Sequence, residues 1–199
     1  MRLIAFILAV LVAGGPAAAQ SWQEYSYPAY SFTVAFPAEP QIETTTYQVA
    51  DGRLVEAHVY SVRLNNGVFK VTVAELANTN LEESTVIDHA IKTLSEGGEV
   101  KINIPHRIYR IYGRQLSVAR ADGSLTTAAV FFANDRLYQI ESTKFAGGSA
   151  ADAIRFQQSL TFDRNVANRT SQQMQAFRAS CQGINANPAG LDDPRCARQ

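Results

Sequence analysis

The sequence predicts an α+β fold: a mostly antiparallel β-sheet with helices packed on its faces, followed by a C-terminal helical tail. Apolar and polar residues alternate along many short segments, which is the period-two pattern of half-buried strands. Turn dipeptides such as Asp51-Gly52 and Asp122-Gly123 separate these segments. In two places the apolar spacing changes to a helical period. Runs of strands interrupted by single helices favour an antiparallel sheet.

The strands are expected in two groups of four. The first group covers residues 30–36, 44–49, 54–64 and 68–76. The second group resumes at Glu99 and continues over residues 114–121, 126–133 and 137–142. Proline and glycine at the ends of these runs support the boundaries, because proline cannot donate to a sheet ladder.

A helix is expected after each group of strands. In the first, Asn80 and Glu83 fit a capping box, and Gly97 ends the helix. Its buried stripe is expected to contain Val86, Ile87, Ala90, Ile91 and Leu94. In the second, Ser149 and Asp152 form the cap. Its buried stripe is expected to contain Ala153, Phe156 and Leu160.

Residues 1–19 have the layout of a secretory signal peptide. Arg2 precedes an apolar run over residues 3–12, and alanines at 17–19 provide a small-residue cleavage site. The run is shorter than the roughly 20 residues that cross a bilayer, although an uncleaved anchor is the alternative interpretation. We expect cleavage after Ala19 and a periplasmic or secreted mature protein without an integral membrane segment.

The chain after this cleavage site has the size of one domain with an additional tail. We expect the α+β domain over residues 20–163. The composition turns polar after Phe162, and residues 164–199 are expected to form a helix followed by a loop. The chain therefore divides into a signal peptide, one folded domain and a C-terminal tail.

The tail contains both cysteines of the chain, Cys181 and Cys196. Such a pair in an exported chain predicts one disulfide, because the compartment is oxidising. Two free thiols are the alternative. The bridge would close a loop of about 15 residues and stabilise the tail by roughly 3 kcal/mol, so we expect it to be structural.

The charge balance argues against a general nucleic-acid-binding protein. The chain has 18 lysines and arginines against 18 aspartates and glutamates. Loss of Arg2 with the signal peptide leaves 17 basic residues against 18 acidic ones, a net charge of −1. A nearly neutral protein does not attract polyanions in general.

The stretch RIYRIYGRQ, residues 107–115, concentrates arginine and tyrosine. It has two interpretations: a basic, aromatic surface for nucleic acid or membrane, or an ordinary strand. Pro105 and Gly113 bracket it too closely for a stable helix, so we predict a strand with a turn or bulge at Gly113.

In that strand the three arginines are expected to divide between two faces, and Tyr109 and Tyr112 to cover apolar surface under the helices. One functional role remains at the end of the sheet near the glycine. There Arg107, Arg110 or Arg114 is expected to help dock an acidic protein partner.

The histidines give little support for metal or catalytic chemistry. His58, His89 and His106 lie far apart in the sequence, and no metal-binding spacing occurs. His58 follows Glu56 by two residues on an expected strand, so the two face the same side. That pair fits a base with an orienting carboxylate, but a solvated surface pair is the commoner case. No Gly-x-Ser-x-Gly motif occurs, and no cofactor is expected.

Four motifs occur in a recognisable order between residues 25 and 163. They are YSFTVAFPAEP, YGRQLSVARADG, DRLYQIES and AIRFQQSL. In this order the chain resembles exported bacterial relatives of the PsbP-like fold, a group that includes an extrinsic photosystem subunit and a Ran-binding import factor. The chain departs from the pattern at Ala29-Tyr30 and at Gln115. The resemblance implies a binding or assembly protein and no catalytic residue.

The function expected from these observations is a non-enzymatic, exported binding or assembly module that acts in the cell envelope by docking on another protein. The alternative is a small hydrolase or ligand-binding protein whose site is assembled from residues distant in sequence. A cavity with convergent titratable groups would favour the alternative, and an exposed apolar or charged face would favour the binding module.

Overall fold

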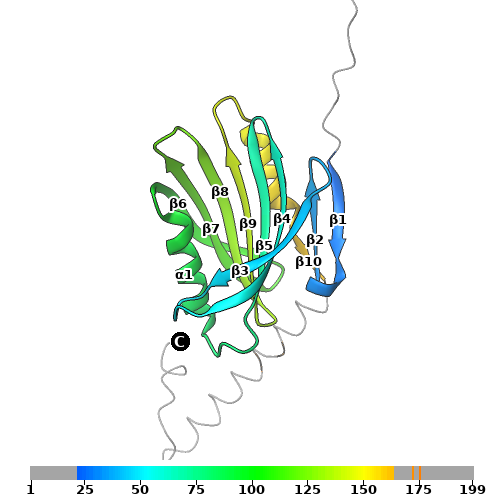
Figure 1. Ribbon diagram of the computed structural model, residues 1–199, viewed down its shortest axis with the longest axis vertical. Helices are drawn as coiled ribbons and strands as arrows, with labels where there is room; N and C mark the ends of the chain where they lie inside the picture. The colour runs from blue at the N-terminus through cyan, green and yellow to red at the C-terminus, as the bar shows by residue number, and fades with distance from the viewer. Residues whose placement is uncertain (1–21, 164–171, 173–174, 176–199) are drawn as a thin grey trace, which may run out of the picture.

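A seven-stranded antiparallel sheet runs through the molecule (Figure 1). The computed structural model describes residues 22–163, 172 and 175. The strand order is β3-β4-β5-β9-β8-β7-β6, so β3 and β6 lie at the two edges. The strands are β3 (Gln41–Gln48), β4 (Leu54–Leu64), β5 (Gly67–Glu75), β6 (Gly98–Ile108), β7 (Ile111–Arg120), β8 (Leu125–Ala133) and β9 (Arg136–Lys144).

A three-stranded sheet packs against one face of the larger sheet. Its order is β1 (Gln23–Tyr27), β2 (Phe32–Phe36) and β10 (Thr161–Phe162), and the 3-10 helix η1 (Pro28–Tyr30) joins β1 to β2. Phe32, Val34 and Phe36 are fully buried, which confirms the alternation predicted for this strand. β1 and β10 have no counterpart in the sequence-based prediction, because β1 leaves most of its side chains exposed and β10 has two residues.

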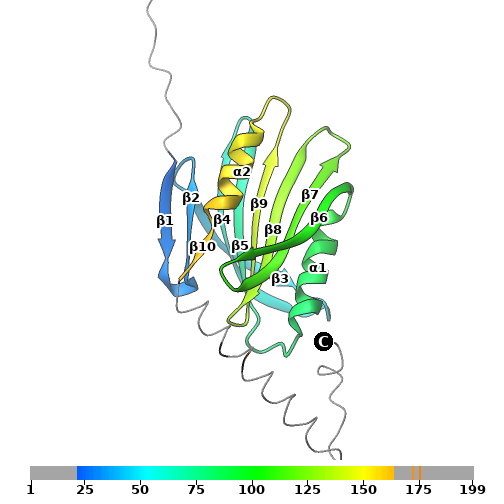
Figure 2. The same ribbon diagram turned by 180° about the vertical axis from the view of Figure 1, so that it is seen from behind.

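The helices α1 (Glu83–Ser95) and α2 (Ala150–Ser159) cover opposite faces of the large sheet (Figures 1 and 2). On the α1 face, the core includes Ala74, Val86, Ala90, Leu94, Leu116, Val130 and Leu137. On the α2 face, where the small sheet also packs, it includes Phe69, Val71, Phe131, Tyr138, Ile140 and Phe156. The molecule thus has three layers, and the predicted α+β class is confirmed.

The two helices predicted within residues 20–163 are present, but only one of their two predicted caps is. Ser149 Oγ accepts a hydrogen bond from the backbone N–H of Asp152 at 3.2 Å, as expected for α2. The capping box at Asn80 is wrong: α1 begins later, its N-cap is Glu82, and Asn80 has a φ of 53°. Gly97, with a φ of 71°, follows the end of α1 as predicted.

Several predictions fall on residues that the structure does not describe. These include the signal peptide with its cleavage after Ala19, the tail helix, and the disulfide between Cys181 and Cys196. Within residues 22–163, neither helix is long and apolar enough to cross a membrane.

Candidate functional site

The arginine- and tyrosine-rich stretch forms a β-hairpin. β6 ends at Ile108, Tyr109 and Arg110 form the turn, and β7 begins at Ile111. Tyr109 takes the left-handed conformation, with a φ of 53°. The predicted turn or bulge at Gly113 is therefore wrong, because Gly113 lies inside β7 in regular pairing with β6. Turn rules assign such a conformation to glycine or asparagine, so the sequence carries no signal for this turn.

Gly113 is required by the close approach of neighbouring strands. A Cβ atom at this position would collide with the carbonyl oxygen of Val130 and would lie 2.6 Å from Cδ1 of Phe131. Both residues belong to β8, the strand that holds the hairpin to the rest of the sheet. The glycine therefore fixes how the hairpin packs on the sheet.

The hairpin places two of its arginines on the same face. Arg107 pairs with Tyr112, and Arg114 pairs with Pro105. Paired residues of an antiparallel ladder point to the same side, and Tyr112 and Arg114 share the α1 face with Leu116. The prediction that the arginines divide between two faces is wrong for Arg107 and Arg114, because the chain reverses at the turn.

The three arginines differ in how firmly they are held. The Arg107 guanidinium lies 5.9 Å from the centre of the Tyr112 ring. Arg114 donates to Oδ1 of Asn103 through Nε at 3.0 Å and Nη2 at 2.6 Å. Arg110, in the exposed turn, has no hydrogen bond or ion pair with another residue of the described domain. Arg107 and Arg110 thus keep their charge available to a partner.

The tyrosines of the hairpin are exposed. Tyr109 is 60% exposed and Tyr112 is 54% exposed, so the prediction that both cover apolar surface under the helices is wrong. Residues 103–116 contain no aspartate or glutamate. We call this region the arginine–tyrosine surface: Arg107, Tyr109, Arg110, Tyr112 and Arg114. It combines a positive charge with aromatic rings, a composition typical of protein interfaces.

A second cluster surrounds His58 at the opposite side of the sheet. His58 Nε2 lies 3.0 Å from Glu56 Oε1, so the pair faces the same side as predicted. The structure adds Thr44, whose Oγ1 lies 3.3 Å from Nδ1 of His58, and Tyr30, whose ring centre lies 4.8 Å from the imidazole centre. Thr44 was absent from the prediction, although its register with His58 follows from the β3–β4 hairpin.

The Thr44 hydroxyl, the His58 imidazole and the Glu56 carboxylate are the group types of a nucleophilic catalytic site. Their surroundings, however, lack the features that such a site needs. Acyl transfer needs donors aimed at the developing oxyanion, in a site that excludes water. Here the Glu56 side chain is 63% exposed, and the hydrogen bonds of His58 lie at the surface. Among the described residues no group of histidine, cysteine, aspartate or glutamate can hold a metal ion.

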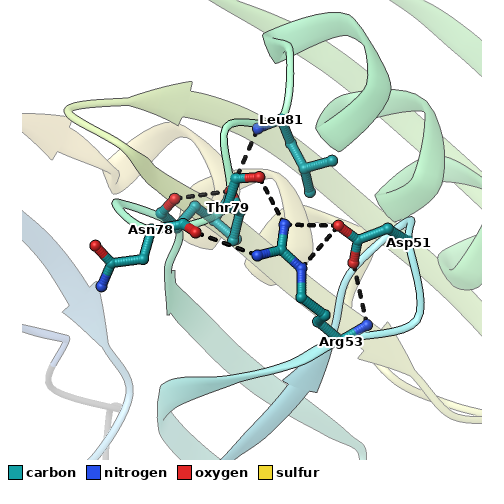
Figure 3. A network of polar contacts seen from close by, with 6 residues as sticks. Asp51, Arg53, Asn78, Thr79 and Leu81 are labelled. Atoms are coloured by element: carbon teal, nitrogen blue, oxygen red, sulfur yellow. Dashed lines mark hydrogen bonds and ion pairs between the residues drawn. The ribbon is translucent and has the colours of Figure 1, made fainter.

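Arg53 joins two loops at one end of the sheet (Figure 3). Its Nη1 and Nη2 donate to the carbonyl oxygens of Asn78 at 3.2 Å and Thr79 at 2.6 Å. Its Nε donates to Asp51 at 2.8 Å, and the hydrogen bonds from Arg53 lower the pKa of that carboxyl. The β3–β4 loop is thereby tied to the loop before α1. We assign Arg53 a structural role, because its guanidinium is directed at these loops.

Two surface grooves of the described domain are large enough for a small ligand. One, of about 440 Å³, adjoins Arg53 and is lined in part by Glu56 and Glu75, but not by His58 or Thr44. The other, of about 630 Å³, lies where β1 meets α2. There the Arg155 guanidinium stacks 4.9 Å from the ring centre of Trp22. Neither groove brings together a base, a nucleophile and an oxyanion donor.

Comparisons with known proteins support the fold. No family model and no curated protein matches the chain. The solution structure of cyanobacterial PsbP (CyanoP) from Synechocystis sp. PCC 6803 is similar, with a TM-score of 0.50 and 13% sequence identity. The match covers 76% of this chain and 98% of that chain. At this identity the likeness extends to the fold alone, and the chain has a PsbP-like fold.

Proposed function

We propose that this protein is a non-enzymatic binding or assembly module of the cell envelope. In this proposal the signal peptide is removed after Ala19, and the mature chain contains the domain at 20–163 and a tail at 164–199. A disulfide between Cys181 and Cys196 staples the tail. The partner is a protein with an acidic surface, and the arginine–tyrosine surface is where it docks.

One observation carries this proposal: the charged groups at the hairpin tip lack acidic neighbours. Arg107 and Arg110 form no ion pair within the described domain, and residues 103–116 supply no carboxylate. Some exposed charges elsewhere in the described domain are paired locally, such as Lys101 with Glu99 at 2.6 Å. A carboxylate-bearing surface would complement the guanidinium groups and the exposed tyrosine rings.

The enzymatic alternative has less support. It would use His58 with Glu56 as an activating pair, and Thr44 as the nucleophile. The described residues provide no enclosed cavity beside these groups and no pair of N–H donors directed at a bound carbonyl. A protein whose fold resembles PsbP, and whose charges gather at a hairpin tip, fits a docking role better.

Affinity capture tests the proposal. The mature protein is immobilised and challenged with an envelope extract, and retained proteins are identified by mass spectrometry. We expect one dominant acidic partner, whose binding falls about tenfold or more in the Arg107→Glu/Arg110→Glu variant. Arg63→Glu is the matched control, because Arg63 is an exposed arginine of β4 that stacks 5.9 Å from the Phe145 ring, away from the hairpin tip.

Two results would contradict the proposal. Equal retention by wild type and by Arg107→Glu/Arg110→Glu would exclude the arginine–tyrosine surface as the docking site. Hydrolysis of an ester or phosphate panel by the purified protein, lost in His58→Ala, would favour the enzymatic alternative.

A further inference from the structure

The outer edge of β3 is a second exposed feature, and it offers backbone groups rather than charged side chains. β3 pairs with β4 in an unbroken register, from Gln41 opposite Ser61 to Gln48 opposite Leu54. In the part of the chain that the structure describes, no strand lies on its other side. Most β3 side chains are exposed, including Ile42 at 58%. A regular edge without proline, lysine or bulge is a template for strand addition.

Hydrogen bonding near the β3–β4 loop shows which backbone groups face outward. The N–H of Val49 donates to the carbonyl oxygen of Arg53 at 2.9 Å. The backbone N–H and C=O groups of Val49 therefore point toward the β4 side and not toward the outer edge. Backbone groups alternate in direction along a strand. The outward-facing residues are therefore Ile42, Thr44, Thr46 and Gln48. His89 Nε2 lies 2.9 Å from the carbonyl oxygen of Gln48, which agrees with this direction.

Because His89 occupies the carbonyl of Gln48, three outward-facing residues remain, and they are symmetric about Thr44. We propose that two copies of the protein pair through their β3 edges, antiparallel, about a two-fold axis at Thr44. Thr44 then lies opposite the partner's Thr44, and Ile42 lies opposite the partner's Thr46. Each outward-facing pair exchanges two N–H···O bonds, about six in all.

The side chains of β3 are compatible with this self-pairing. Glu43 is the one charged residue of the strand, and in this register it lies opposite the partner's Thr45. Ile42 lies opposite the partner's Thr46, so two β-branched side chains meet. No like charges face one another, and cross-strand pairs of this kind are favourable. A second copy of the protein carries these matching side chains on its own β3 strand. We therefore assign a second copy as the molecule that pairs with the β3 edge.

This inference is independent of the docking role proposed for the hairpin. β3 and β6 lie at opposite edges of the sheet, and no residue is shared between the two surfaces. Loss of partner binding on substitution of the arginines would leave self-association unchanged, and the reverse also holds.

A charge substitution at Thr45 tests the proposed register. Thr45→Glu sets a carboxylate opposite the partner's Glu43 twice per dimer, and Thr45→Lys sets an ammonium there instead. We expect the wild type to show a concentration-dependent monomer–dimer equilibrium by sedimentation velocity. The dissociation constant should rise roughly tenfold in Thr45→Glu and fall in Thr45→Lys.

Substitution of the central residue provides a second test. Thr44→Pro removes the central outward N–H and should abolish the dimer, and circular dichroism checks that the variant is folded. Thr44→Ala is the matched control, because it loses the hydroxyl near His58 but keeps the N–H, and it should still dimerise. A wild type that is monomeric at every concentration, or a dimer unaffected by Thr45→Glu and Thr45→Lys, would overturn the proposal.

Discussion

The two edge strands of the large sheet, β3 and β6, differ in what they offer to another molecule. β6 has a register shift between Val100 and Ile102, and Pro105 lies within the regular stretch that follows. Since proline has no N–H, its position must face away from β7. Asn103 shares that outer edge, and its carbonyl accepts from Arg114 Nη2 at 3.3 Å. β3 has no register shift and no proline, so its outward-facing backbone groups stay accessible, except for the Gln48 carbonyl beside His89.

The two proposed surfaces therefore rely on different chemistry. At β6 the backbone edge is obstructed and the side chains of the adjoining hairpin carry charge, so the proposed docking depends on arginine and tyrosine. At β3 the side chains are mostly uncharged and the backbone is open, so the proposed self-association depends on strand pairing. Proline and bulges are usual protections of an edge strand, and β6 has both while β3 has neither.

The largest expected effect is a loss of stability when the packing of the β6–β7 hairpin on β8 is disturbed. Gly113→Ala should destabilise the protein by about 3 kcal/mol, because its Cβ would collide with Val130 and Phe131. Chemical denaturation measures this change. Gly123→Ala is the control: Gly123 has a φ of 79° but open space around its Cβ, so only backbone strain of about 1 kcal/mol is expected. Equal losses in both variants would contradict the assigned role of Gly113.

A smaller, opposite effect is expected where β3 meets the core. The Tyr47 hydroxyl is buried and has no hydrogen-bond partner among the described residues. Tyr47→Phe removes this unsatisfied group and should stabilise the fold by about 1 kcal/mol. Thermal and chemical denaturation measure the gain. A loss of stability would mean that the hydroxyl is bonded in solution.

The same substitution should alter the response to alkaline pH. Burial, together with the nearby Glu141, raises the pKa of Tyr47 to about 12. Because this phenol ionises less readily in the folded state than in the unfolded state, stability is unaffected below pH 10 and falls as the pH rises from 10 toward 12. Tyr47→Phe should therefore lose less stability over this pH range than wild type. Identical slopes in the two proteins would contradict the assignment.

The smallest expected effect comes from a substitution that makes the outer edge of β6 more like that of β3. Pro105→Thr restores an N–H on the outer side of β6 and should add a weak tendency to associate through that edge. Light scattering against concentration, compared with wild type, detects the change. Thr127→Ser, on the interior strand β8, is a control that leaves both edges unaltered. An unchanged association state in Pro105→Thr would mean that the bulge and Arg114 suffice to block β6.

The sequence predicted the features that rest on periodicity, such as the buried face of β2 and the stripe of α1. It did not predict the β6–β7 turn, because Tyr109 adopts a positive φ without glycine or asparagine to signal it. Gly113 gave a misleading signal, since it serves close packing rather than a turn. Because the turn was predicted at Gly113 and not at Tyr109 and Arg110, Arg107 and Arg114 were assigned to opposite faces of the sheet. The hairpin in fact places them on the same face.

Amide hydrogen exchange along β3, followed by NMR at several protein concentrations, tests most directly whether the outer edge of β3 is open and pairs with a second copy. In dilute solution the amides of Ile42, Thr44 and Thr46 should exchange rapidly, while those of Glu43 and Thr45, bonded to β4, are protected. At high concentration all five should be protected, as the second copy pairs with the edge. Protection of Thr44 equal to that of Thr45 in dilute solution, or no change with concentration, would contradict the account.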